Sequence, residues 1–169
     1  MNRVRMSNIW GTQDGFGGIS QPNAAAATAA VPWLASDTTD NPVGPCPKGS
    51  RTAHIAGQPV LLCGPGSPET VPAVSWDDGD WHFAIGEGSG LTWQERALPI
   101  ITELHQVRMP TGPGWLFVDV AQDGEHTTAA WATGRYDYTV YDYHFPWRAV
   151  ETIASMQPWE PRHDMPWER

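Results

Sequence analysis

GWLFVDVAQDGEHTTAAWATGRYDYTVYDYHF, residues 114–145, is the stretch of sequence that decides the fold. Residues 115–121 and 126–132 are short runs that contain β-branched and aromatic residues, which indicates two strands. Between them lies Gln122-Asp123-Gly124-Glu125, an Asp-Gly turn signal, and Gly134 opens a third strand rich in tyrosine. Strands joined by short turns pair with one another, so this stretch predicts an antiparallel meander.

The third strand holds all four tyrosines of the chain, in two groups. Tyr136, Tyr138 and Val140 share one face, whereas Tyr141 and Tyr143 fall on the other, because successive side chains of a strand alternate. Either a β-bulge after Val140 restores the phase, or both faces are covered, one by a helix and one by an arm or a partner. We expect the first group to pack in the core and the second to offer a contact surface.

Upstream of the meander, the sequence predicts two hairpins. Residues 51–64 contain two short apolar runs around Ala56-Gly57. Residues 71–86 place the turn signal Asp77-Asp78-Gly79-Asp80 between two further apolar runs.

The best helical pattern covers residues 91–109. Thr92 and Glu95 have the spacing of a capping box, and Leu98, Ile101 and Leu104 form an apolar stripe. Pro99 is expected to kink this helix or to delay its regular start. A short final helix is expected over 147–157, between two prolines.

These elements predict an α+β fold. Its antiparallel sheet consists of hairpins and a meander, and one long amphipathic helix and a short C-terminal helix pack on one face. Residues 51–157 form the single α+β domain in this prediction. Residues 158–169 form a Pro/Trp-containing C-terminal arm.

Residues 1–50 are predicted to form an extended Gly/Ala/Pro-rich arm. Glycines and prolines interrupt any periodicity, and NAAAATAA (23–30) is too short to hold a helix alone. Large apolar residues such as Trp10 and Trp33 would not occur in a purely solvated linker. The arm is therefore expected to pack against its own domain or against a partner.

Charge limits the classes of partner. The formal net charge is -9, and residues 51–169 carry all of this excess, with sixteen acidic and seven basic residues. An acidic domain repels phosphate groups, so we expect neither nucleic-acid binding nor attraction to an anionic membrane. A protein with a basic surface is the natural complement.

The chain also lacks the apolar runs that a membrane helix or a signal peptide needs, which predicts a cytoplasmic location, or a virion if the protein is phage-derived. Cys46 and Cys63 have no CxxC spacing and no neighbours that would complete a zinc site. In a reducing cytosol two free thiols are expected, and a disulfide between them is the alternative.

No stretch carries a catalytic, cofactor-binding or metal-binding signature, so none is assigned. GEGSG (86–90) lies between a strand and a capped helix, where a phosphate-binding loop would lie. It lacks the GxGxxG register and the lysine of a P-loop, and Glu87 would oppose an anion. A flexible connection is therefore expected.

The six histidines form no HxH or HExxH pattern. A metal site assembled from distant strands, with His82 and His126 beside Asp80 or Glu125, is the alternative. The serines lack a GxSxG setting, and the aspartates at 77–80 are explained by turn chemistry.

The candidate residues for partner binding are aromatic and acidic. Tyrosine and tryptophan are enriched at protein interfaces. The candidates are Tyr141, Asp142, Tyr143, Trp147, Trp10, Trp33, Trp159 and Trp167.

The order of a helix, a strand that begins with tryptophan, an Asp-Gly turn and a second strand, over residues 95–143, resembles that of bacterial immunity proteins of the YezG-like group. This resemblance assigns no role to any residue of the chain. The sequence as a whole predicts a non-catalytic protein-protein interaction module. Its most concrete form is a small cytoplasmic immunity or antitoxin-type inhibitor of a basic partner.

Two other functions are kept open. The first is a structural or accessory subunit of a larger assembly, such as a phage virion or a multisubunit enzyme complex, anchored by its extended arms. The second is a small enzyme whose site is assembled from distant residues and is therefore invisible in the sequence.

Overall fold

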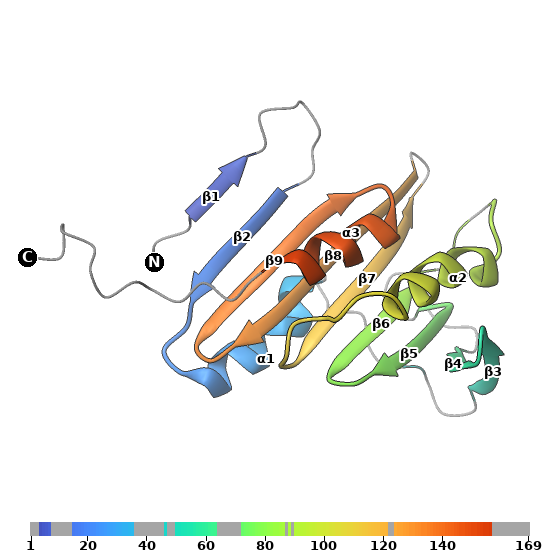
Figure 1. Cartoon of the computed structure of the whole chain (residues 1–169), viewed down its shortest axis with the longest axis horizontal. Helices are drawn as coiled ribbons and strands as arrows, with labels where there is room; N and C mark the ends of the chain where they lie inside the picture. The colour runs from blue at the N-terminus through green and yellow to red at the C-terminus, as the bar shows by residue number, and fades with distance from the viewer. Residues whose placement is uncertain are drawn as a thin grey trace, which may run out of the picture.

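The computed structural model describes residues 4–7, 15–35, 46, 50–63, 72–86, 88, 90–121 and 124–156. Within these ranges the chain forms one sheet of nine strands and three helices (Figure 1). The strands are β1 (Val4–Ser7), β2 (Gly15–Ser20), β3 (Arg51–Ile55), β4 (Gln58–Leu62), β5 (Val74–Asp78), β6 (Trp81–Ile85), β7 (Gly114–Ala121), β8 (Gly124–Thr133) and β9 (Tyr136–Tyr143). The helices are α1 (Ala24–Ala35), α2 (Trp93–Leu104) and α3 (Pro146–Ser155).

The strand order across the sheet is β1-β2-β9-β8-β7-β6-β5-β4-β3. The predicted hairpins β3–β4 and β5–β6 and the meander β7–β8–β9 are confirmed. The prediction of a wholly antiparallel sheet is wrong at one pair, because β6 and β7 run parallel. After β6, the chain passes through α2 and returns to the end of the sheet at which β6 began. β7 therefore runs in the same direction as β6.

The tyrosine strand contains the predicted irregularity. Ala129 pairs with Val140, but Thr127 pairs with Tyr143, so β9 has one residue more than β8 between these two pairs. The predicted bulge is confirmed, and both faces are covered as in the second explanation, but by two helices instead of a helix and an arm or a partner. A bulge shifts the phase of β9 after Val140, and helices cover both faces of the strand, because α3 and α1 each contact it.

The two faces of the sheet have separate cores. One face carries α2 and α3, and its buried residues include Trp81, Phe83 and Trp131 of the sheet and Ile153 of α3. The opposite face carries α1, which packs on β8. Figure 1 shows α2 and α3 in front of the sheet and α1 behind it. The two predicted helices do share one face, but a third helix covers the other.

The N-terminal segment differs most from the prediction. Instead of an extended arm, residues 15–35 form β2, which pairs with β9, and α1, which contains the alanine run. Ala27 and Val31 of α1 are buried against Ala130 and Ala132 of β8. Tertiary packing of small side chains stabilises a helix that is too short to form alone, which is why the propensity argument failed. Residues 158–169, the predicted second arm, lie outside the described residues.

The helix α2 begins where the capping box predicts but is shorter than expected. Its N-cap is Thr92, and it ends at Leu104, not near residue 109. The predicted stripe is corrected at Leu98, which is 46% exposed. The buried apolar side chains of α2 include Ile100, which lies one turn before Leu104 and next to Ile101. None of the helices in the described ranges is long and apolar enough to cross a membrane.

Cys46 and Cys63 form a disulfide, so the prediction of two free thiols is wrong. The Cα atoms lie 4.9 Å apart, within the range that a disulfide can bridge. Sγ of Cys46 also lies 3.2 Å from Oγ of Ser75, a buried residue of β5. The spacing in the sequence cannot show this contact, because the pairing of β4 with β5 sets Ser75 opposite Leu61, two residues before Cys63.

The disulfide predicts a redox-dependent stability. It closes a loop with a sequence separation of 17 residues. Its loss is expected to lower the free energy of unfolding by about 3 kcal/mol, chiefly because the unfolded chain gains freedom. Urea unfolding with and without a thiol reductant measures this difference. The Cys46→Ser/Cys63→Ser variant is the control and should not respond to reductant. An unchanged midpoint for the reduced wild-type protein would contradict the prediction.

Gly114 provides a second prediction for the fold. A Cβ atom at this position would overlap the Trp81 indole on the neighbouring strand β6. Gly114→Ala is therefore expected to lower the free energy of unfolding by about 1–3 kcal/mol through overpacking. In the Trp81→Phe background Gly114→Ala should cost less, because the smaller ring leaves room for the methyl group. An equal cost of Gly114→Ala in the wild-type and Trp81→Phe backgrounds would argue against the overlap.

Candidate functional site

A cleft lies beyond the C-terminal ends of the parallel strands β6 and β7. The connection from β6 to α2 lies there, and the backbone comes very close to β7, because a Cβ atom at Gly88 would overlap Val120. A cavity of about 530 Å³ lies at this point. Its lining residues are Ala73, Gly86, Gly88, Leu91, Thr92, Trp93, Gln94 and Arg96. In α/β proteins, this position is a frequent place for ligands.

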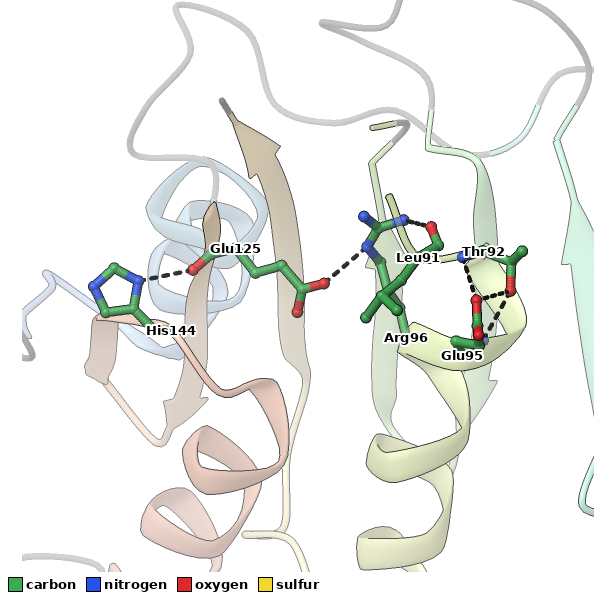
Figure 2. Close-up of polar contacts among 6 residues, drawn as sticks. All are labelled: Leu91, Thr92, Glu95, Arg96, Glu125 and His144. Carbon is green, nitrogen blue, oxygen red and sulfur yellow. Dashed lines mark hydrogen bonds and ion pairs between the residues drawn. The ribbon is translucent and has the colours of Figure 1, made fainter. Parts of the chain in front are cut away.

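The first turn of α2 uses its polar groups internally. The Thr92 backbone N–H donates to Oε2 of Glu95 at 2.7 Å, and the Glu95 N–H donates to Oγ1 of Thr92 at 3.3 Å (Figure 2). Hydrogen bonds from the backbone N–H and the hydroxyl of Thr92 hold the pKa of the Glu95 carboxyl below its ordinary value. A carboxylate thus already occupies part of the site that an anion would need.

Arg96 and Glu125 form a buried ion pair between α2 and β8. Nε of Arg96 donates to Oε1 of Glu125 at 2.8 Å, and Nη1 donates to the Leu91 carbonyl oxygen (Figure 2). The side chains are 5% and 21% exposed, respectively. The charge of Arg96 is therefore balanced inside the protein, and the cleft is not a strongly cationic site.

A histidine pair continues this polar region toward α3. Nδ1 of His144 lies 3.2 Å from the Glu125 carbonyl oxygen, and the rings of His126 and His144 are 5.2 Å apart (Figure 2 draws the first contact). The contacts of Arg96, Glu125 and His144 therefore connect α2, β8 and the segment between β9 and α3.

His82 lies in a different region, with Asp77 of the neighbouring strand. Nδ1 of His82 is 2.7 Å from Oδ1 of Asp77, and its ring packs 4.4 Å from that of Trp115. Nε2 of His82 is buried and has no hydrogen-bond partner among the described residues. The carboxylate fixes the orientation of the ring, but burial of Nε2 keeps it from any substrate or metal in this conformation.

The alternative metal site is not assembled. His82 pairs with Trp115 at the start of β7, whereas His126 pairs with Asp119 four residues further along the same strand. The part of the chain that the structure describes holds no group of three or more His, Cys, Asp or Glu side chains that could bind a metal ion.

The predicted contact residues do not gather on one surface. Trp147 is half-buried at the start of α3, whereas Trp33 is 57% exposed on α1, on the opposite face of the sheet. Tyr141 is half-buried in β9, and Asp142 and Tyr143 belong to the same strand. Trp10, Trp159 and Trp167 lie outside the described residues.

Trp147 has two neighbours that the sequence interpretation did not single out. Phe145 is 56% exposed, and its ring lies 6.2 Å from that of Trp147. The guanidinium carbon of Arg148 lies 5.7 Å from the Phe145 ring and 5.3 Å from the Trp147 ring. We call Phe145, Trp147 and Arg148 the α3 aromatic surface. Pro146, which starts α3, was the available signal that these side chains would share one helical turn.

Comparison with family models, with curated proteins and with solved structures finds nothing that matches this chain. The resemblance to immunity proteins therefore stays a prediction from the order of the elements.

The ion pair predicts an asymmetric effect of substitution. Glu125→Ala leaves the Arg96 cation buried without its carboxylate, so we expect the free energy of unfolding to fall by about 3 kcal/mol. Replacing both residues with methionine removes the unpaired charge and should cost less than Glu125→Ala alone. Urea unfolding of the three variants measures this, with the exposed Glu151→Ala as a control that changes little. Equal stability of Glu125→Ala and wild type would contradict a structural ion pair.

Proposed function

We propose that the protein is a non-catalytic protein-protein interaction module that binds its partner through the α3 aromatic surface. The observation that carries the proposal is the cluster of Phe145, Trp147 and Arg148, in which Phe145 and Arg148 are exposed and Trp147 is half-buried. Aromatic and arginine side chains dominate binding energy at protein interfaces, and an exposed phenylalanine gains from being covered.

The surface rests on a rigid support. Ala149, Val150 and Ile153 of the same helix are fully buried against the sheet. Because α3 is held in this way, the aromatic side chains lose little further backbone freedom when a partner binds.

The charge of the chain supports a basic partner. The formal net charge is -9, and the carboxylates of Asp77, Asp78 and Asp80 lie in an exposed turn. Glu151 is exposed on α3, next to the aromatic surface. Such a distribution speeds the approach of a cationic protein and makes association sensitive to salt. We propose, most concretely, an immunity or antitoxin-type inhibitor that covers the basic active-site region of an enzyme.

The alternative proposal is a structural or accessory subunit held in an assembly by its arms. Its support is weaker after the fold is known, because residues 15–35 pack within the chain's own domain, β2 as a strand of the sheet and α1 on its face. An enzyme would need His82, His126 and His144 to converge with carboxylates, whereas His82 lies apart from the other two in the described part of the chain.

The experiment compares partner recovery by variants of a tagged protein in its source cells. Phe145→Ser/Arg148→Glu changes only exposed side chains, so the fold should persist. We expect recovery of the bound protein to fall at least tenfold, in line with the loss of interface hot spots. Trp33→Ala is the matched control, since Trp33 is equally exposed on the opposite face, and its recovery should equal that of wild type.

The identity and size of the complex separate the proposals. A basic protein in a small, salt-sensitive complex supports an inhibitor, and a large particle or enzyme complex supports an assembly subunit. Equal recovery by wild type, Trp33→Ala and Phe145→Ser/Arg148→Glu would rule out the α3 aromatic surface as the binding site.

A further inference from the structure

An acidic side chain is buried under the N-terminal segment. Asp137 of β9 has no exposed surface. Its Oδ2 accepts a hydrogen bond from Nε2 of Gln21 at 2.6 Å. Its Oδ1 is buried, with no hydrogen-bond partner among the described residues. Gln21 directly follows β2 and precedes α1, so this bond ties the connection between them to the sheet.

Among the side chains that the structure describes, none places a compensating charge beside Asp137. Asp137 pairs with Ile19 of β2 and with Ala132 of β8, and Ala132 lies in the core that α1 covers. Neither β2 (GFGGIS) nor α1 (AAAATAAVPWLA) contains a titratable side chain. The titratable residues of β8, Glu125 and His126, lie at its opposite end from Ala132.

Arg135, the cationic residue nearest to Asp137 in the sequence, contacts the Tyr136 ring instead. Arg135 is exposed, and its guanidinium lies over the Tyr136 ring, 5.3 Å from the ring centroid. Tyr136 and Asp137 point to opposite faces of β9, because adjacent residues of a strand alternate. A carboxylate at Asp137 thus has one neutral hydrogen-bond donor and no cation among the side chains that the structure describes. The charged residue of β1 on this face by register is Arg5, which pairs with Gly17, two residues from Ile19.

We propose that Asp137 is a pH-sensitive latch for the β2–α1 segment: the neutral carboxylic acid seats this segment on the sheet, and the carboxylate loosens it. When the latch loosens, the face of β8 under α1 becomes accessible. The proposal is independent of the α3 aromatic surface, which lies on the other face of the sheet.

The direction of the pH effect follows from burial. Burial raises the pKa of the Asp137 carboxyl above its ordinary value, and the hydrogen bond from Gln21 opposes this rise. The folded protein therefore holds the proton more tightly than the unfolded chain. The stabilisation is complete below the unfolded pKa of about 3.9 and is lost as the pH rises through the higher folded pKa.

The first test is a carbon-13 NMR titration of the side-chain carboxyl of Asp137 in the wild-type protein, which needs no substitution. We expect a midpoint above the ordinary aspartate range. Gln21→Leu removes the donor that stabilises the charged form, so it should raise the midpoint further. A wild-type midpoint at or below the ordinary range overturns the proposal.

The second test is hydrogen exchange at a series of pH values, corrected for the intrinsic exchange rate. Protection of the α1 amides relative to the α3 amides should fall with rising pH, by at most tenfold per pH unit for a single proton. In Asp137→Asn, this relative protection should not vary with pH. Asp119→Asn, at a half-buried aspartate of β7, is the control and should keep the wild-type trend.

Two results of the exchange experiment would overturn the latch. One is the same pH trend in Asp137→Asn as in wild type, and the other is wild-type protection of α1 that rises with pH. If Asp137→Asn does not fold, the NMR midpoints of wild type and Gln21→Leu decide the question.

Discussion

The parallel pairing of β6 with β7 is the contact on which the rest of the structure depends. It joins the hairpins at residues 51–85 to the meander, and without it the sheet would divide in two. Two bonds secure the junction: Gly114 N–H donates to the Asp80 carbonyl oxygen, and Trp81 Nε1 donates to that of Pro110. The same pairing forces α2 to cross the sheet, which creates both the cleft and the face on which α3 packs.

Much of the fold could be predicted, because local patterns carry it. The strand-forming runs of β7, β8 and β9, the aspartate-glycine turn of β5–β6 and the Thr92–Glu95 cap each depend on residues close in sequence. The parallel pair and α1 could not be found in this way. No local sequence pattern indicates which strands pair across a crossover. The alanine run is stable as a helix because it packs against the small alanine side chains of β8.

The candidate sites were less predictable than the fold for a related reason. Trp147 was predicted from residue type and position alone, but its stacking with Arg148 depends on the helical turn that Pro146 starts. The burial of Asp137 could not be predicted, because the helix that covers this face of β9 was not expected. Arg96 and Glu125 are 29 residues apart, so no local sequence pattern indicates that they form an ion pair. Each of these contacts depends on tertiary packing.

The pairing of β2 with β9 constrains how the chain folds during synthesis. The inner edge of β2 has no strand to pair with until β9 leaves the ribosome, more than a hundred residues later. At about 5–20 residues per second, the delay is on the order of ten seconds. An exposed edge of high β-propensity would invite aggregation during that time. The sequence GFGGIS, half of it glycine, is a poor template for other strands until its native neighbour arrives.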